Sequence, residues 1–340
     1  MNKTSFSNKV SESGSKMNQC IYRYRDGCQC DVDRHGDSPF CYWHDPVVDK
    51  SDHYIKEDLE AWAKSGKSMD GFQLKRVDLS NINLVKRGSK NGYSFRDADL
   101  YRANLNKAHL FAVDFSGSSL MKANLSGSNL HCANLENCNL LGVDISRCRL
   151  ENISWGEFVC QEIKAKEALK EGEHLLANDH CQEAEEIYRN IRKNCEKQGL
   201  FETAGYFFHR EMVVRRFQMK PNSFGRFVSK MVDVFCGYGE KPLRVVLFSM
   251  ALIVMCAFSY YFLGISGSEG MVVFDSGQSW RENAMAFANC LYYSVVTFTT
   301  LGYGDFTPVG FSKAMAALEA FAGSFTMALF VVVFVKKMTR

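Results

Sequence analysis

The chain has 340 residues, enough for two or three domains. Its net charge is only +3, from 41 basic and 38 acidic residues, and this balance argues against a nucleic-acid-binding protein. No nucleophile–base pair and no phosphate-cradling loop stands out, so we do not expect an enzyme. The mean hydropathy is slightly negative, which indicates a mostly soluble chain, although apolar residues concentrate after residue 242.

Residues 1–19 are rich in Ser, Asn and Lys and contain no apolar core. This composition is typical of a disordered tail and not of a signal peptide. We therefore expect the long N-terminal part to stay in the cytoplasm. In that reducing compartment, the thirteen cysteines are expected to be free thiols or metal ligands, because disulfides are rare there.

Candidate metal ligands crowd into residues 20–48, in the runs CIYRYRDGCQC and FCYWHD. Thiolate and imidazole ligands suit tetrahedral zinc, and Cys41-x-x-His44 has a favourable ligand spacing. Such a module is too short to bury a core, so a structural zinc ion would hold it together. Unliganded thiols in a small loop are the alternative. The predicted ligands are Cys20, Cys30, Cys41 and His44, with Cys28 as an alternate to Cys30.

A period of five residues dominates the next part of the chain, after an expected linker with a short helix at 49–71. From Phe95 to Leu150 an apolar residue stands at every fifth position, and a small residue precedes nearly every one by two. This period fits neither a helix nor a flat strand, but it fits a solenoid. An earlier set (Leu74, Leu79 and Leu84) precedes an insertion at Lys86–Gly92.

Segments such as ADLYRANLNKA and MKANLSGSNLHCANL resemble the pentapeptide-repeat family. The resemblance implies a right-handed quadrilateral β-helix over residues 72–152, with the twelve regular centres forming about three coils. We expect this solenoid to act as a rigid spacer or scaffold.

Residues 155–219 have a helical pattern with a weak resemblance to a tetratricopeptide-like helix pair; plain helices packed on their neighbours are the favoured interpretation. Beyond Pro221, the apolar residues of 222–238 fall on one helical face. This pattern predicts an amphipathic helix that lies at the inner membrane surface.

Two stretches, 243–264 and 309–336, are long and apolar enough to be transmembrane helices. Basic residues precede the first and follow the second, whereas the connection is mainly acidic, so the positive-inside rule places both termini in the cytoplasm. Between them, residues 283–299 are apolar and aromatic. A third span would break the charge rule, so we predict a re-entrant helix, followed by non-helical backbone that lines a pore.

That backbone, T-L-G-Y-G-D at 300–305, resembles the potassium-channel signature T-V-G-Y-G-D, with Leu301 in place of the commoner Val. The segment as a whole resembles the pore of two-transmembrane (inward-rectifier or bacterial type) potassium channels. A dehydrated potassium ion needs a cage of carbonyl oxygens, and glycines can take the positive φ that aims successive carbonyls at one axis. By the resemblance, the ion-binding residues of the selectivity filter are Thr300, Leu301, Gly302, Tyr303 and Gly304.

The resemblance also assigns supporting residues. Asp305 would bond Tyr292, and Tyr303 would pack on a neighbouring pore helix near Tyr293. Two gating candidates lie in the second span. Gly323 is either a hinge or a site of close helix packing, and Glu319 is a functional candidate because acids are rare inside membranes. Its carboxyl would face either the pore or the pore helix.

Each chain carries one filter strand, so a closed ring needs a homotetramer. The predicted function is potassium-selective conduction across the cell membrane, gated or assembled through the N-terminal cytoplasmic domains by an unknown ligand or protein partner. The predicted contacts are other copies of the chain and membrane lipid, with K⁺ in the pore and Zn²⁺ in the N-terminal module. The alternatives are a non-selective cation channel and a membrane-tethered scaffold with a non-conducting pore.

Overall fold

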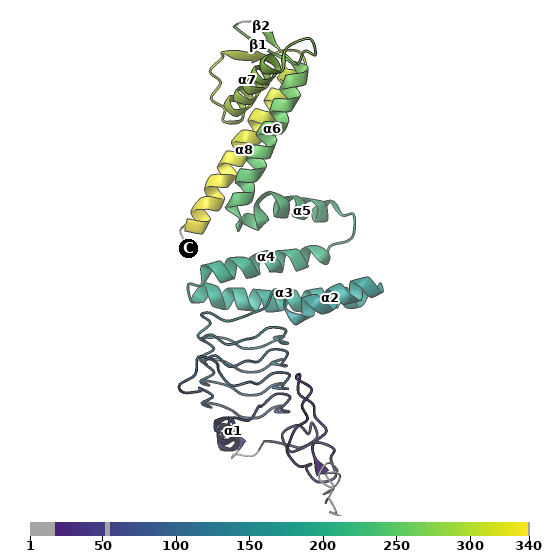
Figure 1. Ribbon diagram of the computed structural model, residues 1–340, viewed down its shortest axis with the longest axis vertical. Helices are drawn as coiled ribbons and strands as arrows, with labels where there is room; N and C mark the ends of the chain where they lie inside the picture. Colours follow the sequence, from purple (N-terminus) through teal and green to yellow (C-terminus); the bar gives the residue numbers. More distant parts are fainter. Residues whose placement is uncertain (1–17, 52–54, 269, 339–340) are drawn as a thin grey trace, which may run out of the picture. The chain divides into compact units, whose positions relative to one another are not determined.

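The computed structural model describes residues 18–51, 55–268 and 270–338 (Figure 1). The tail predicted at 1–19 lies almost wholly outside them. The chain forms two compact units, Met1–Gln218 and Met219–Arg340, and each is described by itself.

A solenoid forms the centre of the first unit. Its parallel bridges join residues one coil apart, such as Ser94 with Asp114 and Asp114 with Asn134, so four five-residue sides make one coil. The first coil is longer, as the pairing of Gln73 with Asp99 shows. It is longer because it contains the insertion that precedes residue 94. The apolar residue at the centre of each repeat points inward and is buried. The stack of coils therefore forms one continuous core.

Both ends of the solenoid are covered, as stacked repeats require. At the first end, the ring of Trp43 stacks on Phe72 at 5.0 Å, close to α1 (Ile55–Lys64). At the other end, Asn190 donates a hydrogen bond to the carbonyl of Val143 (2.8 Å). Asn190 belongs to a group of three helices, α2 (Cys160–Glu171), α3 (His174–Lys197) and α4 (Phe201–Phe217).

Buried polar contacts hold these three helices together. The Tyr188 hydroxyl donates to the Glu162 carboxylate (2.6 Å) and accepts from the backbone N–H of Val159 (3.2 Å). Glu211 of α4 pairs with Arg189 (3.1 Å) and with Arg192 of α3 (2.8 Å). The segment 155–219 is therefore a packed helical cap.

The second unit contains two long helices that lie side by side, α6 and α8, with α7 packed near one end of them (Figure 1). Both long helices have the length and composition of membrane spans. A small antiparallel sheet with strand order β2-β1-β3 lies beside α7. The elements are α5 (Phe224–Cys236), η2 (Gly237–Gly239), α6 (Pro242–Leu263), β1 (Ile265–Gly267), β2 (Gly270–Val272), α7 (Trp280–Phe298), β3 (Phe306–Pro308) and α8 (Ser312–Met338).

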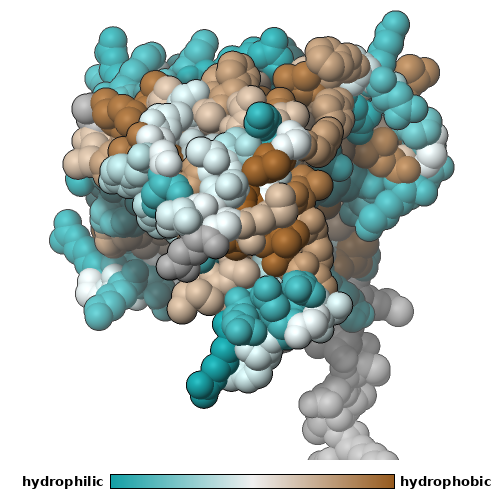
Figure 2. Space-filling view, turned by 90° about the horizontal axis from the view of Figure 1, so that it is seen from above, coloured by the Kyte–Doolittle hydropathy of each residue, from teal (hydrophilic) through white to brown (hydrophobic). Residues whose placement is uncertain are grey.

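Large apolar side chains of this unit remain exposed, including Phe258, Phe321 and Phe325. Figure 2 shows hydrophobic side chains at the surface in the view from above. A soluble monomer rarely leaves so much apolar surface open, so this surface is expected to contact lipid or other chains.

Candidate functional site

The loop that carries the motif at residues 300–305 begins where α7 ends. α7 starts with a capping box, in which the Ser279 hydroxyl accepts from the Glu282 N–H (3.4 Å) and the Glu282 carboxylate accepts from the Ser279 N–H (2.9 Å). The helix therefore begins at Trp280, three residues before the predicted start. The Ser-x-x-Glu signal was present in the sequence and would have identified this start. The last residue, Phe298, leaves the partially negative end of α7 next to the motif.

The motif has an alternating backbone. φ is positive at Thr300 (57°), Gly302 (57°) and Gly304 (81°), but not at Leu301 or Tyr303. In a regular strand successive carbonyls point in opposite directions. Alternation of residues with positive φ and residues with negative φ turns the carbonyls to the same side. Thr300 is β-branched and adopts this conformation at a cost of about 1–2 kcal/mol. Such strained residues cluster at functional sites, although non-glycine residues with positive φ also occur in the solenoid turns of this chain.

In a single chain the motif faces open space. Leu301 and Tyr303 are 59% and 68% exposed. No heavy atom lies within 4 Å of the position that a Cβ would occupy on Gly302 or Gly304. Within one chain, these glycines are therefore needed for their positive φ and not for lack of space.

Around the motif, the Tyr292 ring contacts Phe306 edge-on, and the bond between Tyr292 and Asp305 stays a prediction. Tyr293 was predicted to lie near Tyr303 of a neighbouring chain, and this stays a prediction. Its ring is buried in the same chain, at 4.9 Å from the ring of Tyr260 on α6. Within one chain, α6 covers most of the Tyr293 side chain.

The two gating candidates both face α7. Glu319 is buried, and its carboxyl contacts Tyr260 of α6 and Ser294 of α7. Gly323 lies against the backbone of Phe298, so closely that a Cβ would overlap the carbonyl group there. Close helix packing is therefore a sufficient reason for this glycine. Ser294 and Tyr260 could not be identified from the sequence, because a polar residue in an apolar helix does not reveal its partner.

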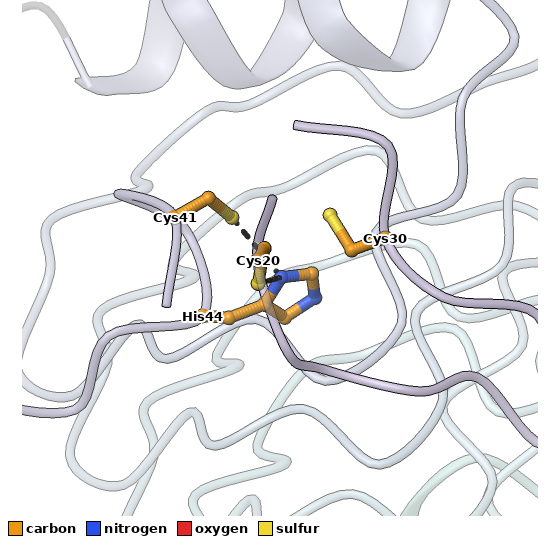
Figure 3. Close-up of side chains that lie close together, drawn as sticks. All are labelled: Cys20, Cys30, Cys41 and His44. Atoms are coloured by element: carbon orange, nitrogen blue, oxygen red, sulfur yellow. Dashed lines mark hydrogen bonds between the residues drawn. The ribbon is translucent and has the colours of Figure 1, made fainter. Parts of the chain in front are cut away.

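The predicted metal ligands lie together in the first unit (Figure 3). Cys20, Cys30, Cys41 and His44 are all buried, and their ligand atoms lie within 4.8 Å of one another. The Nδ1 atom of His44 is 3.1 Å from the Cys41 sulfur and 3.6 Å from the Cys20 sulfur. Cys28, the alternate, is exposed and outside this cluster. Three thiols and one imidazole can bind a metal ion.

Second contacts orient the imidazole. The Nε2 atom of His44 lies 2.9 Å from the Asp70 backbone oxygen, so Nε2 carries the proton and Nδ1 is left to bind metal. The Tyr22 ring stacks on His44 at 4.0 Å. Hydrogen bonding from Cys41 lowers the pKa of the Cys30 thiol to about 4, which favours the thiolate that metals bind. Asp70 could not be identified from sequence, because it lies outside the cysteine-rich segment.

Each of the two parts of the chain matches a known protein family. Residues 243–340 match the family model described as "Ion channel". Residues 91–117 and 118–154 match pentapeptide repeats, in eight copies. The chain joins a pentapeptide-repeat domain to an ion-channel domain. The ion-channel domain and its two apolar helices support a membrane location.

Eighteen solved chains match this one. HetL, a pentapeptide repeat protein of Nostoc sp. strain PCC 7120, is 25% identical over 25% of this chain and 50% of its own (TM-score 0.19). Rfr23 of Cyanothece 51142 is 33% identical over 27% of this chain and 63% of its own (TM-score 0.12). The chain thus spans about half the length of HetL. A search of the curated proteins found no match.

Proposed function

We propose that four copies of this chain form a potassium-selective channel in the cell membrane. The observation that carries the proposal is the alternating backbone at Thr300, Gly302 and Gly304, directly after α7 and between two candidate spans. Such a strand presents several carbonyl oxygens in a row, which is what replaces the water shell of a potassium ion. One strand cannot surround an ion, so the proposal requires a ring of identical chains.

The charges at the helix ends support the proposed orientation. Lys241 and Arg244 stand at the start of α6, and Lys336 and Lys337 at the end of α8. Lys336 pairs with Glu240 at 2.7 Å, so the two basic ends are adjacent. The positive-inside rule places this end of the hairpin, and the N-terminal unit with it, in the cytoplasm.

The test is ion flux through the full chain reconstituted in lipid vesicles. A potassium channel gives potassium flux that barium blocks, and a reversal potential near the potassium value in mixed potassium and sodium. A reversal potential near zero would identify a non-selective cation channel instead. No flux at all would favour the scaffold. Native mass measurement in detergent should find four chains, and a dimer or monomer as the largest species would refute the assembly.

A matched pair of glycine variants tests the motif itself. Gly302 and Gly310 both have positive φ, and both would place a Cβ in open space. Gly302→Ala and Gly310→Ala therefore carry a similar backbone cost of about 1 kcal/mol. Only Gly302 lies in the proposed filter, so only Gly302→Ala should abolish potassium preference. Equal behaviour of the two variants would remove the filter assignment.

We also propose that Cys20, Cys30, Cys41 and His44 hold one structural zinc ion. The support is the donor set, its burial and the orientation of His44 by Asp70. A tetrahedral zinc site with sulfur ligands has ligand-to-ligand distances of about 3.8 Å, which the cluster can reach with small shifts. Such an ion would hold the N-terminal module on the end of the solenoid, since these residues belong to the same core.

Gating through the N-terminal unit is the remaining part of the proposal. If the unit controls the pore, removal of zinc by a chelator should change the rate of potassium flux but leave the reversal potential unchanged. The reversal potential depends on the filter alone, whereas the rate also depends on how often the pore is open. Unchanged flux after zinc has been removed would argue against control through this module.

A further inference from the structure

Glu319 lies where the three helices of the ion-channel domain meet. Its side chain belongs to α8, is 2% exposed, and makes a contact to each of the other two helices. The Tyr260 hydroxyl of α6 donates to Oε2 at 2.6 Å, and the Ser294 hydroxyl of α7 lies 2.5 Å from Oε1. Cys256 of α6 is buried in the same cluster as Tyr260.

Among the residues that the structure describes, no positive charge pairs with this carboxyl. The titratable groups that face it are Cys256 and Tyr260 from α6 and Tyr293 from α7. Within the part of the chain that the structure describes, Glu319 forms no ion pair with Lys, Arg or His. An ionised carboxylate buried without a counter-ion is costly, above all in a membrane.

The number of protons available to these groups also indicates that Glu319 is protonated. The Ser294 oxygen has two close oxygen neighbours, the Ile253 carbonyl at 2.8 Å and Glu319 Oε1 at 2.5 Å. A serine hydroxyl has one proton to donate, so it cannot serve two acceptors. If Glu319 carries a proton on Oε1, it donates to Ser294, Ser294 donates to Ile253, and Tyr260 donates to Oε2. The protonated acid supplies a proton to each of these close oxygen–oxygen contacts, whereas an ionised acid leaves one of the two contacts of Ser294 without one.

We propose that Glu319 is an uncharged positioning residue that ties α7 to α6 and α8 and so fixes the direction in which α7 presents the filter motif. Ser294 precedes Phe298, the last residue of α7, by about one helical turn. A bond at Ser294 therefore restrains the end of the helix from which the motif emerges. Glu319 does not contact the ion, so it acts through α7.

The protonation state can be measured directly, whether or not the chain conducts. The infrared difference spectrum between wild type and Glu319→Gln, recorded near pH 7, should show loss of a protonated carboxylic-acid band. Glu282, which is exposed on the same domain, is the matched control, and Glu282→Gln should remove only carboxylate bands. Loss of a carboxylate band in Glu319→Gln would overturn the uncharged state.

The positioning role rests on the proposed function and has its own readouts. Glutamine can donate to Ser294 and accept from Tyr260, whereas alanine can do neither. Glu319→Gln should keep the potassium-to-sodium permeability ratio from about pH 6 to about pH 8. Glu319→Ala and Tyr260→Phe should lower the ratio roughly two- to tenfold, as loss of one or two hydrogen bonds implies. A ratio that stays unchanged in both would overturn the role.

A second measurement tests the positioning role even if the chain does not conduct or the alanine variant folds poorly. Amide hydrogen exchange at the end of α7 should be roughly two- to tenfold faster in Tyr260→Phe than in wild type or Glu319→Gln. Equal exchange in all three would refute the positioning role. Absence of potassium flux in wild type, with the exchange difference present, would refute the proposed conduction and leave the role of Glu319 supported.

Discussion

Gly323 of α8 lies directly against the carbonyl group of Phe298, the last residue of α7. A methyl group at position 323 would overlap the oxygen and carbon of that carbonyl, and backbone atoms cannot move aside as the end of a side chain can. α8 and the end of α7 are therefore in contact through this glycine.

Gly323→Ala should force α8 away from α7 and destabilise the ion-channel domain by about 1–3 kcal/mol. The measurement is thermal unfolding of the full chain in detergent. The matched control is Gly225→Ala in α5, where a Cβ would meet only the Ser223 hydroxyl at 3.7 Å and the helix gains about 1 kcal/mol from alanine. Equal stability of the two variants would show that α8 does not depend on this close approach.

Cys30→Ser should reduce bound zinc from one ion per chain to far less than one, because it removes one of four buried ligands. Elemental analysis of the purified chain gives the zinc content. Cys28→Ser is the matched control, since Cys28 is two residues away but exposed and outside the cluster. If both variants keep one zinc ion per chain, the proposed ligand set is wrong. If the wild-type chain contains no zinc, the proposed metal is wrong.

Asp70→Asn should destabilise the first unit by about 1.5–3 kcal/mol, because it removes the charge from a buried carboxylate that accepts several hydrogen bonds. The Asp70 carboxylate is 2% exposed and pairs with Arg96 at 2.7 Å. It also accepts from Ser94 at 2.5 Å. Unfolding of the full chain in denaturant, followed by tryptophan fluorescence, reports the change.

The comparison for this variant is Asp97→Asn. Asp97 pairs with Arg25 at 2.6 Å, but both side chains are more than a third exposed. A solvated ion pair contributes about 1 kcal/mol or less. The two variants should therefore differ clearly, and an equal loss of stability would mean that burial does not determine the strength of these pairs.

Ser279→Ala should loosen the start of α7, because it removes the hydroxyl that accepts from the Glu282 N–H. Loss of such a cap costs about 1 kcal/mol, equivalent to about fivefold faster exchange of the first-turn amides. Hydrogen exchange followed by mass spectrometry measures this. Glu282→Gln should preserve the capping box and exchange as wild type does. Unchanged exchange in Ser279→Ala would show that packing alone holds the helix start.

The solenoid was predictable because each of its repeats contacts mainly its neighbours along the stack. A five-residue period in the sequence therefore corresponds to a repeated environment in space, as the pairing of Ser94 with Asp114 shows. The two long apolar helices were predictable for a similar reason: length and apolar composition are local properties. The filter motif is also local, since Gly302 and Gly304 mark positive φ by residue type.

Other features depend on residues that are far apart in the chain. The sequence did not decide whether Cys28 or Cys30 is the metal ligand. The structure shows that Cys30 is buried beside Cys41 and His44, whereas Cys28 is exposed. Tyr293 could not be assigned to α6 from its sequence position, because helical periodicity defines a face but not what covers that face.

The amino-acid sequence by itself determined the elements of this protein: a period-five solenoid, a cysteine-rich module and two apolar spans around a glycine motif. Only the tertiary structure decided the contacts between elements, such as Glu319 with Ser294 and Tyr260, and His44 with Asp70. The physical reason is that backbone preference and hydropathy are properties of neighbouring residues. A buried polar group instead takes the partner that packing brings within hydrogen-bonding distance.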